Sequence, residues 1–399
     1  MNSAAYSEMA TRERIDALLS EPVAVAEERE RTMFAAQLAN SDGTVILFGA
    51  GRLGRLCARA LRRGGVPLRA FCDGNVALHG TSVEGADVLA LDEAALRFGS
   101  SALFVVAIWT GTARESMLER IAYLRARGCR TVVPYPALVW AHGREETPFH
   151  SFDLPSRILA HRAELREVGR LLADDVSLHT YAIEMARRLL GEFAETPPAP
   201  NQYFPRDLIA PAEDEVFVDG GAYTGDTLMD FLRFSEGRFS AYHGIEADPT
   251  NAARLRETVT RLPDDVRSKC TVHEVALHSR AEALSFAAVG STTSQWAVAG
   301  RHQVRGVPLD DLLRNHRMSF LKLDVEGAEP EALAGAEALL RREQPIAAVC
   351  VYHCPDHLWS ISLALHAPLP RHRFALRCHG QDGWESVCYV IPESRCCLR

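Results

Sequence analysis

The sequence predicts an α/β protein with two parallel-sheet domains, the second built on a seven-stranded, doubly wound sheet. Short apolar runs alternate with amphipathic stretches between residues 44 and 140, and this pattern returns from residue 215 onward. In each half, a glycine-rich turn follows the first apolar run. Strands that alternate with helices form parallel sheets that are covered on both faces. A length of 399 residues suits two or three such domains.

The N-terminal half is expected to contain a helical segment (1–40), an α/β domain (41–150) and a helical linker (151–200). Good helix formers fill residues 6–39, with a break at Pro22. The linker pattern predicts two helices within residues 156–194, followed by a stiff proline-rich stretch. The α/β domain contains four apolar runs that we interpret as buried strands: Val45–Phe48, Leu68–Cys72, Leu103–Ile108 and Thr131–Val133.

The C-terminal domain, residues 201–399, contains seven candidate strands. The last two are close enough in sequence to form an antiparallel pair at one edge of the sheet. The seven apolar runs are Val216–Asp219, Tyr242–Glu246, Thr271–Ala276, Phe320–Asp324, Ile346–Val351, Phe374–Cys378 and Ser386–Ile391.

Composition and charge argue against several classes of protein. The chain has 52 acidic and 44 basic side chains, for a net charge of −8, which does not suit a nucleic-acid or anionic-membrane binder. The first residues show no signal-peptide pattern, and the apolar runs are too short to span a bilayer. The scattered cysteines lack CxxC pairs and are expected to be reduced, so we expect a cytoplasmic protein.

The strongest motif is the loop Asp219-Gly-Gly-Ala-Tyr-Thr-Gly225, which follows the first strand of the C-terminal domain. Gly220, Gly221 and Gly225 let the backbone turn tightly and approach a ligand, and a helix should start near Asp226. The alternative interpretation is a tight strand-to-helix turn without a ligand.

The next strand favours the ligand interpretation. Glu246 ends that strand, 27 residues after Asp219, where an acid can accept both hydroxyls of a ribose. The loop has no phosphate-binding lysine and departs from GxGxxG, so an adenosine ligand with a charged amino acid fits better than a dinucleotide. Asp219 would then face the ammonium group of that ligand.

These motifs resemble the FkbM family of methyltransferases over about residues 201–392. The resemblance implies a class I methyltransferase fold and S-adenosylmethionine as cofactor. It assigns Asp219, Gly221 and Gly225 to the methionine end, Glu246 to the ribose, and the backbone of Ala276 to the adenine. The matching pieces are Gln202-Tyr-Phe204, Phe217–Thr227, Gly244–Pro249, Glu274-Val-Ala-Leu277, Val307-Pro-Leu-Asp-Asp311 and Phe320–Glu329.

We expect the methyl acceptor at the carboxyl ends of the strands. Lys322, Asp324 and Glu326 alternate in sequence and would share one face if the strand reached that far. The first interpretation is that Asp324 or Glu326 orients the acceptor or accepts its proton. The second is a structural ion pair between Lys322 and either acid.

His353, just past the next buried strand, is the candidate general base, because an unperturbed imidazole titrates near neutrality. Its alternative role is a hydrogen-bonded histidine at the strand end. Cys350, His353, Cys354 and His357 also include zinc-ligand types, but no second ligand pair is evident, so no metal is predicted. A magnesium ion at Asp324 stays open.

The N-terminal domain has its own glycine motif, Gly49-Ala-Gly-Arg-Leu-Gly54, and Asp73 follows the next strand. This context meets the dinucleotide fingerprint of a Rossmann-like domain. The sequence of this domain has no catalytic residues for hydride transfer, such as a Tyr-x-x-x-Lys pair. We therefore favour a structural or acceptor-presenting domain over a nucleotide-binding one.

The favoured function is methyl transfer to a small-molecule acceptor, with a hydroxyl of a sugar or natural-product intermediate preferred and a nitrogen acceptor left open. The alternatives are an NAD-dependent oxidoreductase that uses the N-terminal domain and a non-catalytic nucleotide-binding protein. The oligomeric state stays open, with a homodimer as one alternative.

Overall fold

The computed structural model describes residues 8–111, 115–287, 295–296 and 302–398. The chain forms two compact units. The first comprises residues 1–166, 179–197 and 380–384, and the second comprises residues 167–178, 198–379 and 385–399. The chain therefore passes between the units several times, and the short segment 380–384 returns to the first unit from the second.

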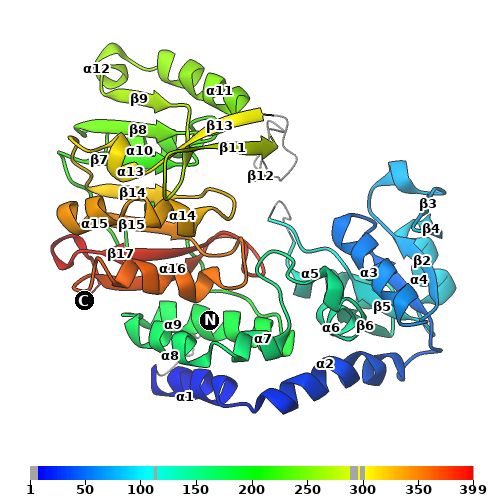
Figure 1. The fold of residues 1–399 in the computed structure, drawn as a ribbon. Helices are drawn as coiled ribbons and strands as arrows, with labels where there is room; N and C mark the ends of the chain where they lie inside the picture. Colours follow the sequence, from blue (N-terminus) through cyan, green and yellow to red (C-terminus); the bar gives the residue numbers. More distant parts are fainter. Residues whose placement is uncertain (1–7, 112–114, 288–294, 297–301, 399) are drawn as a thin grey trace. The chain divides into compact units, whose positions relative to one another are not determined.

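The first unit contains a six-stranded sheet in the order β3-β4-β2-β1-β5-β6 (Figure 1). All neighbouring strands are parallel except the pair β3 and β4. The strands are β1 (Val45–Phe48), β2 (Leu68–Cys72), β3 (Ser82–Val83), β4 (Ala86–Leu89), β5 (Leu103–Val106) and β6 (Thr131–Pro134). The four predicted strands are present, while the pair β3 and β4 was not predicted because its strands have only two and four residues.

The second unit contains the predicted seven-stranded sheet, in the order β16-β17-β15-β14-β7-β8-β9. Figure 1 shows these strands stacked from β9 to β17. The five strands from β9 to β15 pair in parallel, and β17 is antiparallel to both β15 and β16. The strands are β7 (Val216–Gly220), β8 (Ala241–Ile245), β9 (Cys270–His273), β14 (Phe320–Leu323), β15 (Ile346–Cys350), β16 (Arg373–Cys378) and β17 (Ser386–Ile391). The fold class predicted from the sequence is therefore confirmed.

A separate four-stranded sheet in the order β10-β13-β11-β12 was not predicted. It contains β10 (Ala276–Leu277), β11 (Glu282–Ala287), β12 (Gln295–Trp296) and β13 (His302–Val307). The prediction of one continuous strand over Thr271–Ala276 was wrong, because β9 ends at His273 and Ala276 pairs with Gly306 in the second sheet.

The helices mostly begin where the sequence offers a cap or a proline. Pro22 separates α1 from α2, as predicted, and Ser116 and Glu119 form a reciprocal capping box at the start of α5. The region predicted to hold two linker helices contains three. None of the described helices is both long and apolar enough to cross a membrane. The helices are α1 (Glu8–Leu19), α2 (Val23–Leu38), α3 (Arg52–Arg63), α4 (Leu91–Phe98), α5 (Met117–Ala126), α6 (Pro136–His142), α7 (Pro155–Leu159), α8 (Arg162–Leu171), α9 (Asp175–Leu190), α10 (Asp226–Phe234), α11 (Pro249–Thr260), α12 (Asp264–Arg267), α13 (Leu309–Leu312), α14 (Glu329–Ala334), α15 (Glu337–Glu343) and α16 (His357–His366).

The strands of the six-stranded and the seven-stranded sheet are mostly buried and apolar. The strand cysteines Cys72, Cys350, Cys378 and Cys388 are buried and carry free thiols, as expected from their apolar surroundings. In the second unit, the pairing of β7 with β14 and of β14 with β15 brings the ends of these three strands to one edge of the sheet. That edge carries the predicted site residues.

Candidate active site

The glycine loop after β7 is shaped by close contact with β14. Gly221 has φ +76°, and a Cβ there would lie 1.8 Å from the carbonyl oxygen of Asp324. At Gly220, a Cβ would lie 2.7 Å from the side chain of Leu323. Gly225, with φ +91°, precedes the first residue of α10. These glycines let the loop turn against the neighbouring strand, and α10 begins at Asp226, as predicted.

Glu246 lies directly after β8 and turns back toward this loop. One carboxylate oxygen accepts the backbone N–H of Tyr223 at 2.9 Å, and the other accepts that of Asp248 at 2.8 Å. Burial raises the pKa of Glu246 to about 7, although the two backbone hydrogen bonds oppose the shift. The carboxylate is therefore held in a fixed orientation beside the glycine loop, where the sequence predicted a ribose.

Asp219 is fully buried at the end of β7. Its carboxylate lies 3.1 Å from the ammonium of Lys322 and accepts a hydrogen bond from the hydroxyl of Tyr242 at 3.0 Å. Lys322 also donates to the carbonyl of Gly221 at 2.6 Å. Burial alone would lower the pKa of Lys322, but Asp219 and Asp324 outweigh it and raise the pKa. The alternative interpretation of an ion pair between Lys322 and Asp324 or Glu326 does not hold, because Lys322 pairs with Asp219 on the neighbouring strand.

Ala276 is buried in the small sheet, where it packs with Val304 and with Ala247, the residue after Glu246. Ala276 therefore lies near Glu246, although it is not part of the seven-stranded sheet. Its contact with adenine stays a prediction.

Asp324 follows β14, which ends one residue earlier at Leu323. One oxygen of its carboxylate accepts a hydrogen bond from the hydroxyl of Tyr203 at 2.8 Å. Glu326 has φ +53° and lies in a turn. The expectation that strand alternation brings Lys322, Asp324 and Glu326 to one face therefore fails, since the strand stops before the two acids.

His353 nevertheless brings both acids together. Its Nε2 lies 3.4 Å from Asp324 and 3.8 Å from Glu326. Burial alone would lower the pKa of His353, but Glu329, Asp324 and Glu326 outweigh it and raise the pKa to about 10. This contradicts the premise that His353 titrates near neutrality. A protonated imidazole cannot accept a proton, so His353 fits a positioning group better than a general base.

Further polar residues surround these acids and were not predicted as site residues. Glu385 accepts a hydrogen bond from the side-chain amide of Gln202 at 2.8 Å and one from the hydroxyl of Tyr352 at 3.3 Å. Burial raises the pKa of Glu385 and raises that of Glu326 to about 7. Gln202 and Tyr203 belong to a sequence motif that matched the family, whereas Glu385 lies in a loop with no distinguishing pattern.

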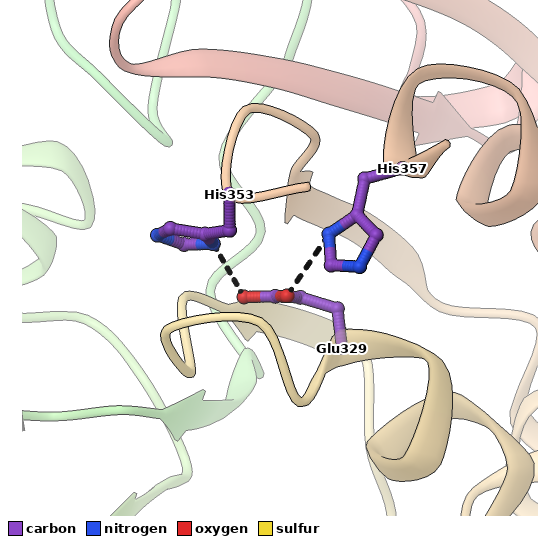
Figure 2. Close-up of side chains that lie close together, drawn as sticks. All are labelled: Glu329, His353 and His357. Atoms are coloured by element: carbon purple, nitrogen blue, oxygen red, sulfur yellow. Dashed lines mark ion pairs between the residues drawn. The ribbon is translucent and has the colours of Figure 1, made fainter. Parts of the chain in front are cut away.

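Glu329 lies behind His353, as the first residue of α14, and is fully buried. One carboxylate oxygen lies 2.9 Å from Nδ1 of His353, and the other lies 3.3 Å from Nδ1 of His357 (Figure 2). Burial would raise the pKa of Glu329, but the two histidines outweigh it and hold the pKa well below its usual range. Cys350, part of the zinc pattern considered in the sequence, instead contacts the hydroxyl of Tyr203.

Residues 219–371 match the family model of the methyltransferase FkbM domain. The match begins at Asp219 and includes the glycine loop, Glu246, Asp324 and His353. No curated protein matches the chain in sequence.

Among solved structures, the methyltransferase FkbM from Methylobacillus flagellatus KT superposes with a TM-score of 0.76 and 20% identity, over 96% of this chain and 99% of that chain. At this identity the likeness shows a shared fold. The glycopeptide N-methyltransferase MtfA, complexed with S-adenosylmethionine, covers 34% of this chain and 43% of its own, with a TM-score of 0.20 and 13% identity. That overlap supports no statement about this chain.

The strand order of the second sheet and the whole-chain likeness to an FkbM methyltransferase agree in the fold, and the family model supports the predicted family over residues 219–371. Residues 219–371 therefore match the methyltransferase FkbM domain, a stretch that covers less than half of the chain.

Proposed function

We propose that this chain is an S-adenosylmethionine-dependent methyltransferase that acts on a small polar acceptor. The observation that carries the proposal is the arrangement of β7, β8 and β14 within a methyltransferase FkbM domain. A glycine loop, an oriented acid directly after β8 and two carboxylates beyond β14 all lie at the same edge of one sheet. Ligands of doubly wound sheets bind at this edge.

The cofactor is assigned to the glycine loop and Glu246. The ribose hydroxyls would donate to the Glu246 carboxylate, whose direction is already fixed by the backbone N–H groups of Tyr223 and Asp248. The methionine end would lie along Gly220, Gly221 and Gly225. Asp219 is fully buried and paired with Lys322, which also donates to the carbonyl of Gly221. Asp219 would therefore hold the glycine loop in place, and its negative charge would attract the ammonium group of the ligand.

The acceptor is assigned to the polar side chains beyond β14. Methyl transfer requires the acceptor atom, the methyl group and the sulfonium to align, with water excluded. The favoured acceptor is a hydroxyl of a sugar or natural-product intermediate, because Asp324 and Glu326 offer oxygens that can receive its proton. Tyr203 and His353 would hold Asp324 in place from two sides. An amine acceptor is the competing outcome of the test below.

Single-turnover transfer of a labelled methyl group tests this proposal, with a panel of hydroxylated sugars and amines as acceptors. We expect Asp324→Asn and His353→Ala to lower turnover about 100-fold, since misplacing the reacting groups has that cost. The affinity for S-adenosylmethionine should stay within a few-fold of wild type. Asp311→Asn, an exposed acid on α13, is the control. Near-normal turnover in both variants would contradict the acceptor assignment, and preferential labelling of amines would replace the hydroxyl.

A further inference from the structure

Glu329, His353 and His357 form a buried cluster whose ligand-type atoms all lie within 4.8 Å of one another. We propose that this cluster is a zinc site, formed by Nδ1 of both histidines and the Glu329 carboxylate, which fixes the orientation of His353. This inference does not depend on the proposed methyl transfer, because none of its three ligands is assigned to cofactor or acceptor through these atoms.

The first argument is burial without hydrogen bonds. The side chains of Glu329, His353 and His357 are at most 4% exposed. Apart from the ion pairs that they form with one another and with Asp324 and Glu326, the ring nitrogens of His353, Nδ1 of His357 and one oxygen of Glu329 have no hydrogen-bond partner of acceptable geometry. Buried polar atoms are almost always satisfied, and a bound ion is one of the few ways to satisfy several at once.

The second argument is the geometry of the ligand atoms. Figure 2 shows the two imidazole rings directed at the same carboxylate from different sides. The two nitrogen–oxygen distances are 2.9 and 3.3 Å. These distances involve different oxygens of Glu329, and the three ligand atoms all lie within 4.8 Å of one another. Ligand atoms at about 2.0 Å from a tetrahedral zinc lie about 3.3 Å apart, so the three side chains would close in around the bound ion.

The third argument is the chemistry on the far side of His353. A histidine that binds a metal usually donates its other ring N–H to a carboxylate. With Nδ1 on the metal, Nε2 of His353 would carry the proton and face Asp324, 3.4 Å away. The two imidazoles and one carboxylate suit zinc among the divalent ions, since magnesium and calcium prefer oxygen ligands alone. Water would take the fourth position.

The site would link α14, the loop after β15 and the first turn of α16. It would hold His353 neutral and fixed, with its proton directed at Asp324. In this arrangement His353 remains a positioning residue, and its fixed side chain holds Asp324 beside the acceptor.

The test uses tag-free, chelator-stripped protein titrated with Zn²⁺ alone, in competition with a chromophoric chelator. We expect one tightly bound zinc per chain. His357→Ala should weaken binding more than 100-fold, whereas Asp324→Asn, which removes only the charge of the neighbouring carboxylate, should weaken it about 10–100-fold. His161→Ala, an exposed histidine paired with Glu164, is the control and should bind like wild type.

Glu329 also accepts the backbone N–H of Val325, so its replacement can perturb folding, and His357→Ala is the deciding variant. Thermal unfolding of the stripped proteins checks that this variant is folded. Substitution with Co²⁺ adds a second readout, because a four-coordinate site gives strong visible d–d absorption. A wild-type protein that binds no zinc, or a folded His357→Ala variant that binds it equally well, would overturn the proposal.

Discussion

The two glycine loops of the molecule have closely similar local structures but different neighbours. In the first unit, the backbone N–H of Ala50 donates to Asp73 at 2.8 Å. In the second unit, that of Tyr223 donates to Glu246 at 2.9 Å. Each acid ends or follows the strand beside its loop, and each is held by the loop backbone. By this feature alone, both loops look like nucleotide sites.

The difference lies at the next strand. Beyond β5 the chain continues as Ala107-Ile108-Trp109, and a Cβ on Gly49 would lie 2.5 Å from the side chain of Ile108. Trp109 packs against Tyr135 and Trp384 and is buried. Beyond β14, by contrast, the chain presents Asp324 and Glu326. A glycine loop therefore indicates a strand–turn–helix unit, whereas the neighbouring strand end decides whether chemistry can take place beside it.

The largest expected effect in this comparison concerns the backbone of the two loops. Gly221→Ala should destabilise the second unit by about 3 kcal/mol or more, because the new Cβ meets a backbone oxygen and φ is positive. Gly51→Ala, where a Cβ meets nothing within 4 Å, should change stability by about 0.5 kcal/mol or less. Urea unfolding, followed separately for each unit, measures both. A mild effect at Gly221 would show that the loop can move away from β14.

An effect of intermediate size concerns pH. Because burial raises the pKa of Glu246 to about 7, the free protein loses this charge as the pH falls below neutrality. Ribose hydroxyls prefer the ionised carboxylate, so affinity for S-adenosylmethionine should fall toward tenfold per pH unit below about pH 7 and level off above about pH 8. Calorimetry across this range, repeated with Glu246→Gln, separates the protein's titration from that of the ligand. The same slope in the variant would exclude Glu246 as its origin.

The smallest expected effect is at the first unit. NAD, NADP and nucleotide sugars should leave the melting temperature unchanged, since the strand end beside Gly49 is filled by the unit's own apolar side chains. Differential scanning fluorimetry at saturating ligand measures this, because a ligand of the native state must stabilise it. A clear shift with any of these ligands would restore the dinucleotide interpretation of Gly49, Gly51 and Gly54.

The sequence was most informative for strands that are apolar along their whole length. Val45–Phe48 and Ser386–Ile391 were predicted to the residue, because apolar runs bounded by polar residues leave little choice of strand ends. The small sheet around Ala276 was missed because β10 and β12 have only two residues each and β13 mixes polar and apolar residues, so no apolar run marks the sheet. For the site, the loop after β7 and Glu246 follow from one local motif and could be found in the sequence.

The remaining site residues depend on contacts that sequence spacing does not encode. Glu329 and His357 meet only because α14 and α16 start beside the same loop, and Glu385 reaches Gln202 from the far end of the domain. The alternative ion pair considered for Lys322 named acids that follow its own strand, whereas its partner Asp219 is on the neighbouring strand. The raised pKa of His353 is caused by Glu329, Asp324 and Glu326, which come close to its ring only in the folded chain.

The central claim is that the loop of the second unit, and not that of the first, holds S-adenosylmethionine. Its most direct test is a paired calorimetric titration of S-adenosylmethionine against Glu246→Ala and Asp73→Ala, with circular dichroism to check that both variants are folded. Loss of hydrogen bonds to a charged group costs about 1.5–3 kcal/mol, so Glu246→Ala should bind at least about tenfold more weakly. Asp73→Ala should bind like wild type. Unchanged affinity in folded Glu246→Ala, or weakened binding in Asp73→Ala alone, would contradict the claim.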